Sequence, residues 1–289
     1  MGRDVKVLPA LPKVEGLLFK AVKGMLKRPG RLSALPDRAL MVMNHTQSLL
    51  GLSRYAGVTG FTLRDSVPAT WLHVLTFPLQ TELMAADDFP FSLAGLVHVT
   101  NEMTLHRPVS VEEKLRISVR AANLAPHAKG ATFDMLGEIH VGDELVWEGV
   151  SNYLASGAKV KGEPVPAVRL AAPEAAPSQQ WRLAPDLGRQ YAAVSGDSNP
   201  IHLTPLTARL FGFPRPIIHG MWTHARAVAA LGGKLPEAYT VKVQFAKPIM
   251  LPGKVGFSSV HDGDDWRFAV VNKEGKPHLV GELSPRFAG

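Results

Sequence analysis

Alternation of apolar and polar residues predicts β-strands in two separate regions of the chain. In the second region, Val241, Val243 and Phe245 alternate with Lys242 and Gln244, which is the period-2 pattern of a strand with one buried face. The strand leads to a proline, and a second strand follows after a short gap.

The two regions are related by an internal repeat with an offset of 140 residues. The segment 105–109 reads LHRPV, and the segment 245–249 reads FAKPI. In each copy a second strand begins at a Lys followed by an apolar residue, and a hairpin follows, around Gly142–Asp143 in the first copy and Glu274–Gly275 in the second. Duplication is favoured over chance similarity because strand, Pro, Lys and hairpin occur in the same order twice.

Each half also needs a helix to cover one face of its sheet. In the second half, residues 217–231 carry one apolar stripe at helical spacing, and Gly232–Gly233 ends it. In the first half the weaker counterpart is residues 71–84, interrupted at Pro78. The pattern therefore predicts an α+β protein of two units, each an antiparallel sheet around one central helix.

The 289 residues divide into four parts on this reading. We expect a basic N-terminal extension at 1–39, a first unit at 40–160 and a second unit at 179–289. Between the units, residues 161–178 hold four prolines among alanines, which is typical of a semi-rigid linker.

The net charge of +7 is concentrated at the N-terminus. The first 31 residues carry eight Lys or Arg against two acidic residues, so the rest of the chain is nearly neutral. This argues against a nucleic-acid-binding face, which would spread over the folded body. Residues 14–26 show helical spacing of apolar positions and predict a basic amphipathic helix. The helix either packs on the body or, through residues 1–31, contacts a membrane surface or an acidic carrier protein.

Several classes of protein are excluded by what the sequence lacks. There is no cysteine, which rules out disulfides, thiolate metal sites and cysteine nucleophiles. No apolar run reaches the roughly 18 residues of a membrane span, and no secretory signal is recognisable, so a cytoplasmic location is expected. The glycine-rich dinucleotide and phosphate loops, the serine nucleophile elbow and the zinc-protease motif are also missing.

The segment that carries candidate chemistry runs from Tyr191 to His202. A helix is predicted to end at Ser195–Gly196, which leaves Asp197 in a polar turn. Asn199 followed by Pro200 has the form of a helix cap with Pro at the first helical position. Asp197 and His202 are thus expected on irregular backbone, held by the proline between them.

A carboxylate and an imidazole that are held close together can bind one water molecule between them. Their ordinary pKa values, about 3.9 and 6.5, let both groups work as acid or base near neutral pH. Downstream, His219, Gly220 and Met221 begin the predicted central helix, whose free N–H groups suit a developing oxyanion. Gly220 would let a carbonyl approach closely. Together these groups suit addition of water to an α,β-unsaturated thioester.

The segment from Tyr191 to Ala208 resembles the hydratase 2 motif of the MaoC-like dehydratases, the (R)-specific enoyl-thioester hydratases. The shared pattern is an aromatic residue, then Ser-Gly-Asp-x-Asn-Pro-Ile-His, five residues and an Ala. The resemblance is closest over residues 181–289, while residues 40–160 are similar to the partner half of double-hotdog members. It implies a double hotdog fold, two tandem units each with an antiparallel sheet wrapped around a central helix.

The resemblance also implies roles for individual residues. Asp197 and His202 would be the catalytic pair, and the Gly220 N–H would be the oxyanion hole. Asn199, Ser195 and His219 would bind substrate or support these groups. Because the first half lacks both motifs, one active site per chain is expected, with the first half as the wall of the acyl pocket.

The implied substrate is an acyl thioester of coenzyme A or acyl carrier protein, with no metal and no redox cofactor. Arg209, Arg215 and Lys247 are candidates for contacts to coenzyme A phosphates, or are simply solvated surface charges. A metal site built from His219 and His224 with the catalytic pair matches no common zinc spacing.

Two other functions and one assembly stay open from the residues alone. A thioesterase on the same fold would release free thiol from acyl-CoA. A non-catalytic acyl-thioester-binding subunit would need no acid/base pair, so the intact motif argues against it. A homodimer of double-hotdog protomers is an assembly that the resemblance allows.

Overall fold

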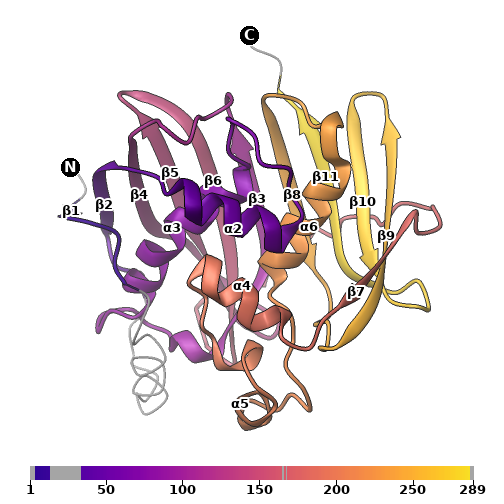
Figure 1. Ribbon diagram of the computed structural model, residues 1–289. Helices are drawn as coiled ribbons and strands as arrows, with labels where there is room; N and C mark the ends of the chain where they lie inside the picture. Colours follow the sequence, from indigo (N-terminus) through magenta and orange to yellow (C-terminus); the bar gives the residue numbers. More distant parts are fainter. Residues whose placement is uncertain (1–3, 14–33, 165, 167, 287–289) are drawn as a thin grey trace.

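A single sheet of eleven strands runs through both halves of the described chain, with helices packed on one of its faces (Figure 1). The computed structural model describes residues 4–13, 34–164, 166 and 168–286. The strand order is β1-β2-β4-β5-β6-β3-β8-β11-β10-β9-β7. Apart from the parallel pair β1 and β2, all neighbouring strands are antiparallel.

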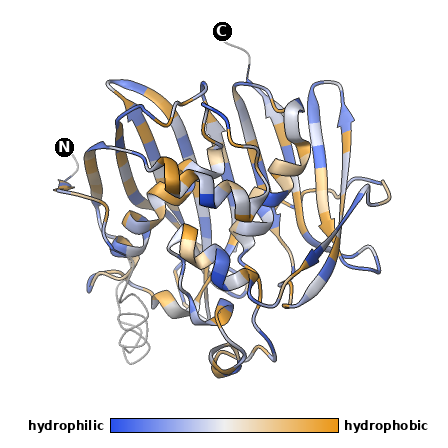
Figure 2. Cartoon of the chain, in the orientation of Figure 1, coloured by the Kyte–Doolittle hydropathy of each residue, from blue (hydrophilic) through white to orange (hydrophobic). Residues whose placement is uncertain are grey.

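Each half contributes five strands in equivalent order, as the repeat predicts. The strands of the first half are β2 (Arg38–His45), β4 (Leu115–His127), β5 (Gly130–Val141), β6 (Glu144–Ser156) and β3 (Leu96–Leu105). Those of the second half are β7 (Gln179–Leu183), β9 (Gly253–Asp262), β10 (Asp265–Val271), β11 (Pro277–Pro285) and β8 (Tyr239–Phe245). Along β5, buried and half-buried residues alternate, and the corresponding hydropathy stripes are visible in Figure 2.

The two halves join where β3 pairs with β8. Glu102 lies opposite Lys242 at the centre of this pairing, and their side chains form an ion pair with an N–O distance of 3.2 Å. On either side, Asn101 pairs with Val243 and Met103 pairs with Val241. Residues that are equivalent under the 140-residue offset exchange places in these pairs, because Asn101 corresponds to Val241 and Met103 to Val243. The junction therefore has approximate twofold symmetry. The sequence predicts the two units but not that their sheets merge into one.

A long buried helix lies against the sheet in each half. These are α3 (Ala69–Met84) and α6 (Gly220–Leu231), and two further helices, α2 (Leu49–Thr59) and α4 (Leu187–Ser195), pack on each other beside them (Figure 1). The remaining short helices are α5 (Pro205–Leu210) and the 3-10 turns η1 (Leu93–Gly95), η2 (Pro200–His202) and η3 (Gly232–Lys234).

The structure corrects two details of the predicted helices. Pro78 does not interrupt α3, which continues through it, because 13 of its 16 residues are buried and this packing outweighs the lost backbone hydrogen bond. The second helix begins at Gly220 rather than at residue 217. Ile217 instead forms a β-bridge with Met250, and the Ile218 N–H donates to the Ile249 carbonyl at 2.9 Å.

The N-terminal extension also contributes a strand that the sequence did not predict. β1 (Asp4–Leu8) pairs in parallel with β2 at the edge of the sheet. The amphipathic helix predicted over residues 14–26 lies outside the described residues. Among the helices that the structure describes, none has both the length and the apolar character needed to cross a membrane.

Candidate active site

The residues of the sequence motif lie on a segment that is much longer in the second half than in the first. Helices α2 and α4 end equivalently, at Gly60 and Gly196, both with left-handed backbone (φ 83° and 76°). From there the first half reaches its β-bridge at Ser66 after five residues, whereas the second half reaches Ile217 after the 20 residues 197–216. The additional residues form η2 and α5 and include Asp197 and His202. The corresponding segment of the first half is too short to form these elements, which explains why the motif occurs once.

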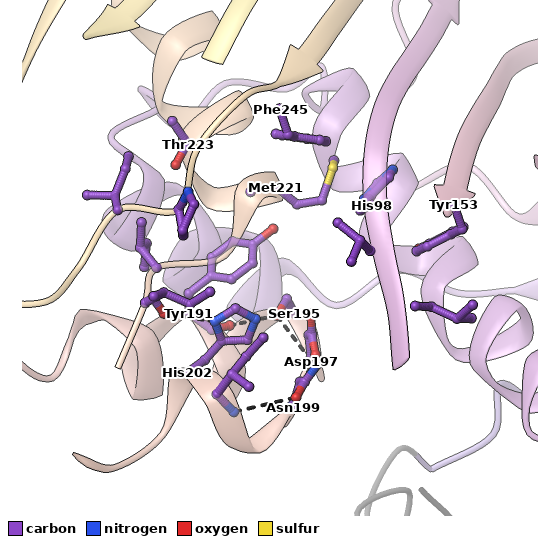
Figure 3. Close-up of a pocket in the computed structure, with 18 of the residues that line it drawn as sticks. His98, Tyr153, Tyr191, Ser195, Asp197, Asn199, His202, Met221, Thr223 and Phe245 are labelled. Atoms are coloured by element: carbon purple, nitrogen blue, oxygen red, sulfur yellow. Dashed lines mark hydrogen bonds between the residues drawn. The ribbon is translucent and has the colours of Figure 1, made fainter. Parts of the chain in front are cut away.

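A chain of short-range hydrogen bonds shapes the turn around Asp197. The Ser195 hydroxyl donates to the Tyr191 carbonyl at 2.8 Å and accepts the Asp197 N–H at 3.2 Å. The Asp197 carboxylate accepts the Asn199 N–H at 3.1 Å, and the Asn199 side chain accepts the Ile201 N–H at 3.4 Å. The predicted turn and cap are therefore present, and Ser195 and Asn199 act on the backbone that presents the carboxylate (Figure 3).

The short helices that follow are held against α4. Thr204 and Thr207 form a reciprocal capping box at the start of α5. Gly188 on α4 faces the backbone of His202 so closely that a Cβ there would lie 2.1 Å from the His202 carbonyl oxygen. A glycine at this position is needed for η2 to seat against the helix.

His202 is buried and has a defined tautomer. Its Nδ1 lies 2.8 Å from the Ile217 carbonyl oxygen, and because a carbonyl only accepts, Nδ1 must carry the proton. Burial, with the nearby His219, lowers the pKa of His202 to about 3, so the ring is neutral near pH 7. The remaining nitrogen, Nε2, then holds a lone pair and can accept a proton.

His219 links the Asp197 turn to the start of α6. Its Nε2–H donates to the Asp197 backbone carbonyl at 2.9 Å, and its ring stacks on His202 with 3.6 Å between ring centroids. Burial lowers the pKa of His219 to about 4, which keeps this ring neutral as well. The prediction that His219 supports the site fits this position.

The side chains of Asp197, His202 and His219 offer ligand atoms that all lie within 4.8 Å of one another. One nitrogen of each imidazole is already engaged by a backbone carbonyl, so each ring has one left to offer. His224, which the sequence grouped with them, is not part of this cluster. The space between these groups suits a single small polar molecule or ion.

Gly220 is the first residue of α6 and lines the cavity beside this group. No side chain caps this helix N-terminus, so its first N–H groups are available to a ligand. A Cβ on Gly220 would lie 2.9 Å from the Phe245 ring, so packing in this region favours glycine.

A cavity of about 440 Å³ extends from these groups to the first half of the chain. Asp197, His202 and Gly220 line it on one side, as does Tyr191 (Figure 3). The wall from the first half consists of residues on α3, η1, β3 and β6, among them His73, Val74, Phe77, Met84, Leu93, His98 and Tyr153. The first half thus forms a wall of the pocket, as the resemblance implies.

The sequence predicted that the first half forms a wall of the pocket, but not which of its residues do so. The pKa of Tyr153 is raised by its burial and by the charge of Asp197, which places this tyrosine within the electrostatic reach of the site. His98 stacks on Tyr153 with 4.6 Å between ring centroids. Neither residue lies in a local motif, and only the fold brings them to the cavity.

The three cations proposed for phosphate contacts differ in their positions. Lys247 lines the cavity and is exposed, consistent with a place at its mouth. Arg209 and Arg215 are also exposed but do not line the cavity, and Arg215 donates to the Pro252 carbonyl at 3.5 Å. The structure therefore brings Lys247, but not the two arginines, to the cavity.

Sequence and structure comparisons agree with this architecture. The model of the MaoC like domain matches residues 169–281. The 3-hydroxyacyl-thioester dehydratase X of Mycobacterium tuberculosis is 36% identical over 268 residues, covering 92% of this chain and 96% of that protein. The (R)-specific enoyl-CoA hydratase of Aeromonas caviae is 38% identical over 66 residues, which cover 23% of this chain and 49% of that protein.

A crystal structure of HtdX from Mycobacterium tuberculosis superposes with a TM-score of 0.77 and 33% identity, covering 86% of this chain and 100% of that chain. The fold is thus a double hotdog with one long motif-bearing segment. The chain belongs to the MaoC-like dehydratase family.

Proposed function

We propose that this protein catalyses the reversible hydration of trans-2-enoyl thioesters to (R)-3-hydroxyacyl thioesters, with Asp197 and His202 as the catalytic pair. The carrier of the acyl group is coenzyme A or acyl carrier protein, and the reaction needs no metal or redox cofactor. The proposal rests chiefly on one observation, which is that Asp197 and His202, whose Nε2 is free, lie close together and line the same cavity as Gly220 at the N-terminus of α6.

In the hydration direction, one water molecule lies between the Asp197 carboxylate and His202 Nε2. Both groups accept hydrogen bonds from it, which directs an oxygen lone pair towards the β carbon of the substrate. As the new C–O bond forms, the pair takes up one water proton. The C=C electrons move towards the carbonyl and give an enolate, and the pair then returns one proton to the α carbon.

The Gly220 N–H stabilises the enolate oxygen. A donor fixed at a helix N-terminus is already oriented and gains strength as negative charge develops on the acceptor. His219 acts through Asp197, because its hydrogen bond to the Asp197 carbonyl holds the carboxylate turn against this helix. His219 is thus a positioning residue.

Substitution of the pair tests the assignment directly. Asp197→Asn and His202→Ala should each lower kcat for crotonyl-CoA hydration by about 10²–10⁴-fold, the range typical of lost general acid–base catalysis. The loss is followed through the enoyl absorbance, with folding checked by circular dichroism. Asp264→Asn, on the exposed β9–β10 turn, is a matched control that should keep full activity.

Near-wild-type turnover in either variant would contradict the assignment. Parallel use of a thiol reagent separates the alternatives. Release of free thiol without loss of the double bond would indicate a thioesterase, and tight binding of enoyl-CoA with no turnover would indicate a binding subunit. A cytoplasmic location and a homodimeric assembly remain predictions from the sequence.

A further inference from the structure

Three histidines that are not part of the catalytic pair lie near the junction of the two halves. His73 lies on α3, His98 on β3 and His224 on α6. His73 and His98 line the cavity, and the ring centroids of these two are 6.4 Å apart. His224 is near enough for its charge to lower the pKa of His98, and the charge of His73 acts on both others.

Two of the three are related by the internal symmetry. His73 is the fifth residue of α3, which begins at Ala69, and His224 is the fifth residue of α6, which begins at Gly220. The two central helices thus direct equivalent histidines towards the junction of the halves. An imidazole is thus placed at the same position of both helices, among buried residues that are mostly apolar.

The imidazoles are buried without adequate partners. His73 is 3% exposed and His224 is fully buried. Four ring nitrogens, namely His73 Nδ1, His98 Nε2 and both nitrogens of His224, have no hydrogen-bond partner among the residues that the structure describes. Buried polar atoms are almost always satisfied in folded proteins, so the nitrogens of His73 and His98, which line the cavity, point to a polar ligand that completes them.

The chemistry of the cluster favours an uncharged ligand that both donates and accepts. Burial lowers the pKa of His73 to about 4 and that of His224 to about 3, so the rings are neutral near pH 7. A neutral imidazole presents one N–H donor and one lone pair. None of the described lining residues that the first half contributes is a Lys or Arg, so a carboxylate on the ligand would find no cation on this wall. A hydroxyl group matches both functions.

The position of the cluster defines where on the substrate this hydroxyl would be. Figure 3 shows His98, beside Tyr153, on the opposite side of the cavity from His202, with Met221 and Phe245 nearby. Beyond His73, the same face of α3 lines the cavity with Val74, Phe77 and Met84. An acyl chain that enters this cavity from the reacting carbons would therefore contact both the imidazoles and an apolar wall.

We propose that the His73–His98–His224 cluster is a polar subsite that selects acyl chains carrying a hydroxyl group beyond the reacting double bond, followed by an alkyl tail. This deepens the proposed hydratase function and rests on it. A bound hydroxyl donates to an imidazole lone pair and accepts an imidazole N–H, which satisfies nitrogens that an unsubstituted alkyl chain would leave unpaired.

The test is a series of trans-2-enoyl-CoA substrates of one chain length. One member is unsubstituted, and each other member carries a single hydroxyl on a successive carbon beyond the double bond. We expect one position at which kcat/KM exceeds that of the unsubstituted substrate by about tenfold or more, the effect of a well-made buried hydrogen bond. Equal or lower kcat/KM for every hydroxylated member would overturn the proposal.

Variants link the preference to the cluster. His73→Leu should abolish the preference, so that the ratio of kcat/KM for the hydroxylated substrate to that for the unsubstituted one falls to about one. His261→Leu, an exposed histidine of β9 outside the cavity, is the control and should keep the wild-type ratio. A preference that persists in a folded His73→Leu protein, as judged by circular dichroism, would count against the cluster.

Failure of this inference and failure of the proposed function are distinguishable. Turnover of the unsubstituted substrate without any hydroxyl preference refutes only the subsite. If no enoyl thioester is hydrated, the proposed function is wrong, and calorimetry still tests the subsite. There, a saturated acyl-CoA with the hydroxyl should bind more tightly than its unsubstituted counterpart, and equal affinity would refute the subsite.

Discussion

Mild acid should destabilise this protein because it buries neutral imidazoles. The pKa values of His202 and His224 are lowered to about 3, and those of His73 and His219 to about 4, in each case chiefly by burial. In the unfolded chain these groups return to a pKa of about 6.5. Between these values the unfolded state binds more protons, so stability is full above pH 6.5 and falls as the pH drops towards 4.

The magnitude follows from linkage. At pH 5.5, one unit below the unfolded pKa, each histidine that stays neutral in the fold lowers the free energy of unfolding by about 1.4 kcal/mol relative to pH 8. Four such groups together contribute about 6 kcal/mol. This is a large share of the roughly 5–15 kcal/mol by which a typical protein is stable.

Urea unfolding at pH 8 and pH 5.5 measures this loss. The variant His224→Leu removes one buried imidazole, and its loss between the two pH values should be smaller by about 1.4 kcal/mol. The exposed His261→Leu should lose as much as the wild type. Stability that does not change between pH 8 and pH 5.5, or an equal loss in His224→Leu and wild type, would refute the reasoning.

Three other predictions concern the active site. Gly220→Ala places a Cβ 2.9 Å from the Phe245 ring, and thermal melting should show destabilisation of about 1–3 kcal/mol alongside reduced kcat. His219→Phe retains a ring to stack on His202 but loses the hydrogen bond to the Asp197 carbonyl, so kcat should fall by about tenfold or more with KM little changed. Dialysis against a chelator should leave hydration unchanged, and loss restored by a divalent cation would instead identify Asp197, His202 and His219 as metal ligands.

Local sequence signals account for most of what was predictable about the site. The end of α4 at Gly196, the Asn199 cap on η2 and the capping box at Thr204 depend on hydrogen bonds between residues a few positions apart. Such features can be predicted from the sequence because they involve only neighbouring residues. For the same reason the motif located Asp197 and His202 on one short segment.

The repeat could also be predicted from the sequence, since the duplicated strands keep their order. The pairing of β3 with β8 is symmetric under the same 140-residue offset that the sequence shows. Pro78 illustrates the limit of local rules, because it predicts a break that the burial of α3 overrides.

The sequence by itself therefore determined the two α+β units and the turn that presents Asp197. Only the tertiary structure decided that the two sheets merge through β3 and β8, that β1 extends the edge, and that His73, His98 and Tyr153 face the cavity. The physical reason is the separation along the sequence between the residues that interact. Caps and turns are satisfied within a few residues. Strand partners and cavity walls instead depend on the free energy of burying side chains that lie more than 150 residues apart, such as the equivalent pair His73 and His224.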